Sequence, residues 1–207
     1  RILYYGIDLG PFQHSVDKRS LRAEFGIPAN AFVIGHVGRF VDVKNHGFVV
    51  RVARELFQML PDAYLLLVGD GPTRQQTEIL VQELGIAERV VFAGMRSDVA
   101  DVMIGGMDAF IFPSLYEGFG LVALEAQAAG IPVVMATTVP HEVAAIPELC
   151  TRLSLDDLIP HWVENIVAIR RCDSRLGREV VIDRLTDSPF NIDNAIETLT
   201  SYYESSK

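Results

Sequence analysis

Basic residues and cysteines are scarce in this chain of 207 residues. Its 18 lysines and arginines stand against 27 acidic residues, giving a net charge of -9. This balance argues against nucleic acid as a partner, because binding a phosphate backbone requires a basic face. The two cysteines, Cys150 and Cys172, show neither metal-binding nor redox spacing. We therefore expect a reduced, cytoplasmic setting.

Long apolar runs are also missing, and the given sequence does not open on a signal-peptide pattern. No run reaches the ~18–20 apolar residues that a membrane helix needs. No signal peptide and no initiating Met open the sequence, which begins Arg1-Ile2-Leu3. We therefore expect this chain to be part of a longer protein.

Several catalytic and binding patterns are absent as well. The five histidines have no metal-ligand spacing, no Asp-x-Asp ends a strand and no Walker lysine is present, so we expect no metal and no other cofactor. Ser114 lacks a recognisable His and Asp arrangement, which disfavours a hydrolase triad. His36 lies in an apolar run and is interpreted as a satisfied core histidine. Asp156-Asp157 is interpreted as a helix cap.

What the chain does contain is a regular alternation of apolar runs and helix-like stretches. The runs are rich in Val, Ile, Leu and Phe, as expected of parallel strands buried on both faces. The predicted strands are 32–37, 64–68, 90–92, 109–112, 132–136 and 150–153, with Arg1–Asp8 as an opening strand that runs into a loop. The predicted helices are 46–60, 72–84, 98–104, 122–129, 156–171, 175–185 and 192–204. The alternation predicts an α/β fold: one Rossmann-like domain, residues 1–207, with an open parallel β-sheet flanked by helices and a helical tail over about 155–207.

Residues suited to ligand binding follow the predicted strands. In such sheets, ligands bind at the carboxyl ends of the strands. The stretch Glu117–Glu125 follows the fourth core strand and places two carboxylates around a Gly-Phe-Gly turn that leads into a helix. Glycines let the backbone approach a ligand, helix-start N–H groups attract anions, and carboxylates accept hydrogen bonds from hydroxyls. This combination suits a ligand that is part phosphate and part sugar.

Two cations follow the first core strand, in Gly38-Arg39 and at Lys44. Together they could clamp a diphosphate. The alternative is that they are solvated loop cations with Asp42 as a partner. The turn Gly69-Asp70-Gly71-Pro72 after the second strand has the same two interpretations, contact with a ligand or a purely structural turn.

Taken together, these motifs resemble those of the family 4 (group 1) glycosyltransferases. The matching motifs are Gly38-Arg39 with Lys44, Val68-Gly69-Asp70-Gly71-Pro72, Pro113-Ser114, Glu117-Gly118-Phe119-Gly120 through Glu125, and Gly130-Ile131-Pro132-Val133-Val134. The resemblance covers Gly6 to about Tyr203. It implies one half of a GT-B fold, the C-terminal donor-binding domain, without the N-terminal acceptor domain. Tyr5-Gly6-Ile7-Asp8 is similar to the family's Asn-Gly-Ile-Asp, with Tyr5 in place of the usual Asn.

The resemblance also implies roles for individual residues. Arg39 and Lys44 would bind the donor diphosphate, Glu117 the hydroxyls of the transferred sugar, and Glu125 the ribose; Arg39, Lys44 and Glu117 are thus the predicted catalytic residues. The remaining predicted donor-binding residues are Gly38, Gly69, Met95, Arg96, Gly118, Phe119, Gly120 and Leu121. The implied reaction is retaining transfer of a hexose from a UDP-sugar, without a metal, in polysaccharide or glycoconjugate synthesis. The acceptor would be a saccharide, a lipid or a small molecule bound through the missing domain; a lipid acceptor would bring the full-length enzyme to the cytoplasmic face of a membrane.

Three other functions are compatible with parts of the pattern. A glycosidase places two carboxylates ~5–9.5 Å apart. Glu117 and Glu125 would lie about 12 Å apart if most of the span were helical, which disfavours a glycosidase. A GT-B sugar-nucleotide epimerase and a non-catalytic nucleotide-sugar-binding module remain open. We expect the chain alone to bind donor weakly and to be inactive in transfer. A last apolar stripe (Ile192, Ala195, Ile196, Leu199, Tyr203) would pack locally or on the missing domain.

Overall fold

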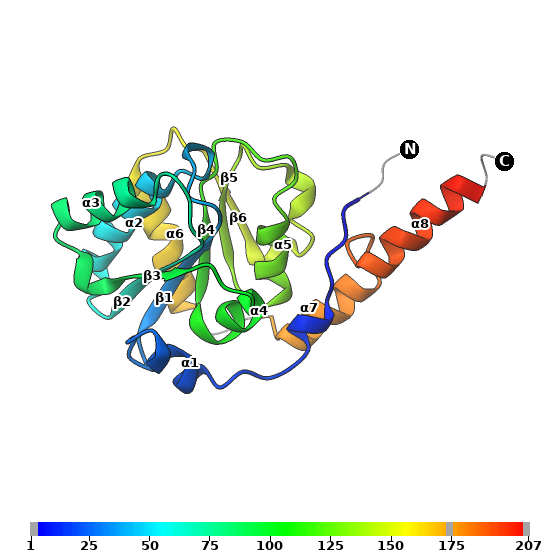
Figure 1. The fold of residues 1–207 in the computed structure, drawn as a ribbon, viewed down its shortest axis with the longest axis horizontal. Helices are drawn as coiled ribbons and strands as arrows, with labels where there is room; N and C mark the ends of the chain where they lie inside the picture. The colour runs from blue at the N-terminus through cyan, green and yellow to red at the C-terminus, as the bar shows by residue number, and fades with distance from the viewer. Residues whose placement is uncertain (1–3, 173–175, 205–207) are drawn as a thin grey trace.

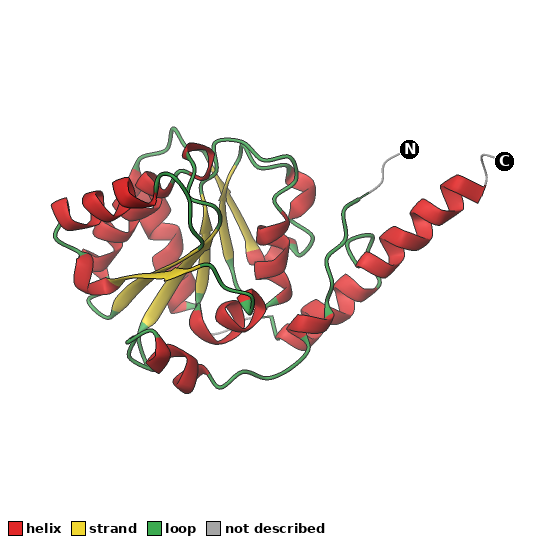
Figure 2. Ribbon diagram, viewed as in Figure 1, coloured by secondary structure: helices red, strands yellow, loops and turns green. Residues whose placement is uncertain are grey.

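A computed structural model describes residues 4–172 and 176–204. Six parallel strands form one open sheet in the order β3-β2-β1-β4-β5-β6 (Figures 1 and 2). The strands are β1 Phe32–Val37, β2 Ala63–Val68, β3 Val90–Gly94, β4 Ala109–Phe112, β5 Val133–Ala136 and β6 Cys150–Leu153. The Rossmann-like α/β fold predicted from the sequence is confirmed, and so are all six predicted core strands to within two residues at each end.

Helices cover both faces of the sheet. They are α1 Lys18–Glu24, α2 His46–Met59, α3 Arg74–Glu83, α4 Val99–Asp101, α5 Leu121–Ala128, α6 Ile159–Arg171, α7 Arg178–Thr186 and α8 Ile192–Glu204, and α4 continues into a wider turn over Val102–Gly106. α2 packs against α3 and α6, whereas α5 packs against α7, β4 and β5. Right-handed crossovers place α2 and α5 on opposite faces, because the connections from β1 and from β4 run in opposite directions along the sheet.

The central strands explain the continuous apolar runs. Every residue of β4 and β5 is buried, as are five of six in β1 and in β2. The edge strands β3 and β6 are largely half-buried. A strand covered on both faces has no polar side, so its side chains do not alternate between apolar and polar.

Helix starts are where the sequence analysis was least accurate. α6 begins at Ile159 with a proline in its first turn, three residues after the predicted start. The Asp157 carboxylate instead accepts a hydrogen bond from the Ser154 N–H (3.0 Å) and closes the preceding turn, so the prediction that Asp156-Asp157 caps the helix was wrong. α3 likewise begins at Arg74, because Pro72 and Thr73 form a turn.

Helix α1 was not predicted at all. It is only seven residues long and buries just one of them, Arg22. Its signal was the cap: Asp17 accepts a hydrogen bond from the Arg19 N–H (3.0 Å).

The opening segment of the described chain contacts the start of α8. The strand predicted for Arg1–Asp8 was wrong for Tyr4–Asp8, where only an isolated parallel bridge joins Ile7 to Asn191, and Arg1–Leu3 lie outside the described residues. The Ile7 N–H donates to the Phe190 carbonyl (2.9 Å) and the Ile192 N–H donates to the Ile7 carbonyl (3.1 Å). The opening segment is thereby tied to the start of α8.

Helix α8 then projects away from the body of the domain (Figure 1). None of its residues is buried, and the predicted apolar stripe exposes Ile196, Leu199 and Tyr203. None of the helices in the described ranges is long and apolar enough to cross a membrane.

Candidate functional site

The loops that follow β1, β2 and β3 are joined through their backbones. The Gly38 N–H donates to the Val68 carbonyl (3.0 Å), and the Gly69 N–H donates to the Gly94 carbonyl (2.8 Å). Gly38 and Gly69, both predicted to lie in the donor site, are therefore neighbours at the carboxyl edge of the sheet.

The loop after β1 is also attached to the loop after β4. It forms a short helical turn, Asp42–Lys44, and ends at Asn45 in the left-handed conformation (φ 56°). The Asn45 amide donates to the Pro113 carbonyl (3.2 Å), and the Leu115 N–H donates to the Val43 carbonyl (2.8 Å). These bonds hold the two loops in register, so the side chains that follow them face each other.

Lys44 and Glu117 form an ion pair across these two loops. The Lys44 Nζ lies 2.5 Å from the Glu117 Oε1, and the two side chains are only 19% and 11% exposed. The ammonium also lies 5.3 Å from the centre of the Phe112 ring. Within the described residues no ion pair joins Asp42 to Lys44, so the alternative in which Asp42 neutralises this cation is not what the fold produces.

A glycine turn and a helix start complete this part of the site. Gly120 has φ 93°, a left-handed conformation that glycine adopts without strain, and α5 begins at the next residue. No side chain caps α5, and the first N–H groups of a helix have no partner within it. A depression of about 380 Å³ opens here. Its lining residues are Tyr5, Lys44, Glu117, Gly118, Phe119, Gly120, Leu121 and Val122.

Glu125 lies in a different depression. This second hollow, about 440 Å³, is bordered by Leu121 and Glu125 of α5, by segments of the first twelve residues, and by 97–101. Burial raises the pKa of the Glu125 carboxyl. Glu117 and Glu125 thus border separate depressions that share Leu121, an arrangement unlike a pair of carboxylates acting on one bond.

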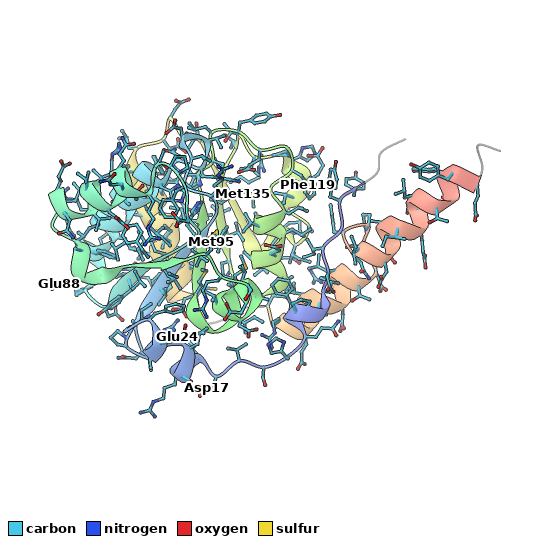
Figure 3. The ribbon with its side chains drawn as sticks, in the orientation of Figure 1. Asp17, Glu24, Glu88, Met95, Phe119 and Met135 are labelled. Carbon is cyan, nitrogen blue, oxygen red and sulfur yellow. The ribbon has the colours of Figure 1, made fainter. Side chains whose placement is uncertain are left out.

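Three further predicted residues differ in how much they are engaged. Arg39 is exposed and has no ion pair within the described part of the chain. Met95, labelled in Figure 3, is 82% exposed. The Arg96 guanidinium is already held by carboxylates, at 2.6 Å from both Glu24 and Asp98. Arg39 is therefore available to a ligand, whereas Arg96 would have to leave two partners.

A pair of buried histidines lies behind Lys44, and its polar atoms were not anticipated. The His36 Nδ1 lies 2.9 Å from the Ile111 carbonyl, but its Nε2 and both nitrogens of His46 have no hydrogen-bond partner among the described residues. His36 is therefore buried as predicted, but only half satisfied. The His46 ring stacks on Phe40 (3.9 Å between centroids) and meets His36 edge-on (4.7 Å). The sequence signal was position, since one histidine precedes the Gly38-Arg39 motif and the other follows Lys44-Asn45.

His36 and His46 are uncharged at neutral pH. Burial, with a smaller contribution from the charge of Lys44, lowers the pKa of His36 to about 4. Burial and the neighbouring His36 and Lys44 lower the pKa of His46 to about 3. At neutral pH they add no positive charge to the site. Across the described ranges, no group of three or more His, Cys, Asp or Glu side chains is arranged to hold a metal ion.

Known structures share this fold. HepE from Anabaena, solved in complex with UDP and glucose, matches with a TM-score of 0.82 at 23% identity, over 99% of this chain and 57% of that one. Sucrose-phosphate synthase from Thermosynechococcus elongatus matches with a TM-score of 0.82 at 27% identity, over 99% of this chain and 52% of that one.

Curated relatives match at the level of sequence. The chain is 34% identical over 205 residues to the putative glycosyltransferase EpsF of Bacillus subtilis, covering 98% of this chain and 52% of that protein. It is 31% identical over 215 residues to the D-inositol 3-phosphate glycosyltransferase of Mycobacterium leprae, covering 98% of this chain and 48% of that protein. The chain thus spans about half the length of these relatives. Residues 17–148 match the family described as glycosyl transferases group 1. With this match over most of its length, the chain belongs to the group 1 glycosyl transferases.

Proposed function

We propose that this chain binds a nucleotide-sugar donor, a UDP-sugar, and forms the donor-binding half of a GT-B enzyme. That enzyme transfers a hexose to an acceptor hydroxyl, with retention of anomeric configuration, in polysaccharide or glycoconjugate synthesis. The similarity to HepE, solved with UDP and glucose, supports the choice of donor. The acceptor is a saccharide, lipid or small molecule held by an N-terminal domain, and the enzyme works in the cytoplasm or peripherally at its membrane face.

The observation that carries this proposal is the Lys44–Glu117 pair beside an uncapped helix start. Nucleotide-sugar transfer builds negative charge on the departing diphosphate. Arg39, Lys44 and the first N–H groups of α5 supply fixed positive charge and dipoles for it, so no metal is needed. In the unliganded domain, Glu117 neutralises Lys44. An incoming diphosphate takes over Lys44, which frees the Glu117 carboxylate to accept hydrogen bonds from sugar hydroxyls.

The second depression suits the nucleoside end of the same donor. It shares Leu121 with the first depression and is bordered by Glu125, whose carboxylate can accept hydrogen bonds from ribose hydroxyls. Neither glutamate acts as a proton shuttle in this scheme. The leaving phosphate helps to deprotonate the acceptor on the front face of the sugar.

A donor screen tests this proposal directly. UDP-, GDP- and ADP-sugars are each added to the 207-residue chain, and the thermal unfolding midpoint is measured. We expect UDP-sugars to raise it, because a ligand at 100 times its dissociation constant stabilises the folded state by about 2.7 kcal/mol. The Lys44→Ala variant should lose the shift, whereas Arg54→Ala, which removes an exposed arginine of α2, should keep it. No shift with any donor would contradict the proposal. Epimerised donor in place of transfer, in the longer enzyme, would favour an epimerase.

A further inference from the structure

Tyr5 lines the Lys44–Glu117 depression, and the backbone that follows it is held in place. The next residue, Gly6, is pressed against the start of α8: a Cβ added to it would lie 2.5 Å from the Ile192 Cα. The Ile7 N–H then donates to the Phe190 carbonyl, and its carbonyl accepts from the N–H of Ile192, the first residue of α8. The backbone beside Tyr5 is therefore held, although it belongs to a loop.

Neighbouring side chains in this segment point to opposite sides, so Tyr4 packs against the protein and Tyr5 faces outward. Tyr4 is half-buried and meets Phe190 edge-on, with 5.3 Å between ring centroids. Tyr5 is 71% exposed. Its ring lies 6.5 Å from that of Phe119, which in turn lies 5.8 Å from Phe190. Figure 3 shows Phe119 in the turn before α5, on the side that faces the N-terminal segment. Phe119 thus supports Tyr5 from the protein side and leaves most of the ring open.

The chemistry of this depression matches the two kinds of surface on a sugar ring. A pyranose has hydroxyls around its edge and C–H groups on its faces. The Glu117 carboxylate and the Gly118–Gly120 backbone can form hydrogen bonds with the hydroxyls, and Lys44 can bind the adjoining phosphate. Tyr5 supplies a rigid, amphipathic ring at low conformational-entropy cost, suited to an apolar face.

We propose that Tyr5 is a specificity-determining residue that packs against the sugar of the donor, distinguishing a nucleotide sugar from the nucleotide alone. The proposal rests on the proposed donor site and adds to it a residue outside the glycine turn.

The test compares each nucleoside diphosphate with the matching nucleotide sugar. Binding of UDP, GDP and ADP, and of their glucose or mannose derivatives such as UDP-glucose and GDP-mannose, is measured by calorimetry on the 207-residue chain. In Tyr5→Ala, we expect binding of the nucleotide sugar to weaken ~5–10-fold, the size of one aromatic contact, with binding of the nucleotide unchanged. Tyr5→Phe should retain wild-type binding of both. Tyr203→Ala is the matched control, since Tyr203 is also 71% exposed but lies on α8.

The outcomes separate this inference from the function on which it rests. Selective loss for the nucleotide sugar supports the role of Tyr5. Equal loss for nucleotide and nucleotide sugar, or no loss, overturns it while leaving the donor site standing. A wild-type chain that binds none of these ligands overturns the proposed donor site and the role of Tyr5 with it. Because unchanged nucleotide binding is itself a measure of folding, a misfolded variant cannot imitate the expected result.

Discussion

Each end of the sheet has an ion pair largely shielded from solvent, but the surroundings of the two pairs differ. At the amino end, Arg22 is completely buried and donates to the Asp108 carboxylate (2.6 Å) and to the carbonyls of Ala29, Ala31 and Gly105. At the carboxyl end, the Lys44–Glu117 pair lies beside an uncapped helix start. In the first cluster, protein groups accept the hydrogen bonds of the Arg22 guanidinium. In the second, the first N–H groups of α5 have no side-chain cap and are open to a ligand.

This contrast separates stability from binding. A buried charge is tolerated when every donor and acceptor is satisfied, and such a network gives a unique structure. Burial alone would raise the pKa of Asp108, but hydrogen bonds from Lys18 and the Val33 N–H, with the charge of Arg22, hold it below its usual value. Near Lys44, by contrast, the nitrogens left without partners on His36 and His46 cost stability. We therefore expect the cluster at the amino end to stabilise the fold and the pair at the carboxyl end to contact a ligand.

The largest expected effect is on stability at the amino end. Arg22→Ala should lower the free energy of unfolding by about 3–5 kcal/mol, because it leaves Asp108 charged and buried without its guanidinium partner. Urea unfolding measures the loss. Arg39→Ala is the matched control at the opposite end and should change stability by less than about 0.5 kcal/mol, since Arg39 is exposed. Equal losses in the two variants would erase the distinction between the ends.

The next effect is on turnover at the carboxyl end. In a longer enzyme containing this chain, Arg39→Ala and Lys44→Ala should each lower turnover by about 10²–10³-fold, the usual cost of one charge-stabilising group. Fluorescence or circular dichroism should show an intact fold. Arg54→Ala, at an exposed pair with Glu55, should be unaffected. Near-normal turnover in both site variants would remove these cations from the mechanism.

The two ends should also titrate in different ranges of pH. The pKa values of His36 and His46 in the fold, about 4 and about 3, lie below the ordinary 6.5, so the unfolded chain takes up protons first. Stability should fall as the pH drops from about 6.5 toward 4, by roughly 3 kcal/mol for His36 alone. The contribution of Asp108 is present above its ordinary pKa and is lost only as the pH falls below about 4.

Unfolding free energies measured between pH 8 and pH 4.5 check this prediction. His46→Phe should make the curve shallower in this range without flattening it, because His36 still titrates, whereas Asp108→Asn should leave its slope unchanged while lowering the whole curve. A wild-type curve that stays flat from pH 7 to pH 5 would mean that the histidines are not held neutral by the fold.

The smallest effect separates the two cations that share Asp108. Lys18 lies 2.6 Å from the Asp108 Oδ1, but its side chain is 48% exposed. Lys18→Ala should therefore cost no more than about 1 kcal/mol, against several for Arg22→Ala. If Lys18→Ala cost as much as Arg22→Ala, the burial of a side chain would not determine how much its contact with Asp108 contributes to stability. Urea unfolding of the single and double variants measures both.

Sequence reasoning was most successful where one physical rule dominates. Strands buried on both faces must be apolar throughout, so the core strands were found almost to the residue. The candidate site followed, because the carboxyl ends of parallel strands meet at one edge, and Lys44 and Glu117, far apart in the sequence, do meet there.

The misses came from contacts that the sequence does not display. The start of α6 depends on whether Asp157 caps a helix or a turn, and both use the same kind of hydrogen bond. That His36 is only half satisfied depends on the position of its second nitrogen, which no pattern encodes. The engagement of Arg96 with Glu24 likewise joins residues 72 positions apart.

The close contact of Gly6 with Ile192 has a mechanical consequence. Two backbone hydrogen bonds join Ile7 to Phe190 and Ile192, and the contact of Gly6 with Ile192 leaves no room for a side chain. The opening segment and helix α8 are therefore attached to each other at one point. A force applied to Tyr4 or to α8 is thus carried to the other through this shared joint. The ring contacts of Tyr4 with Phe190 and of Phe190 with Phe119 connect this joint to the residue that precedes Gly120.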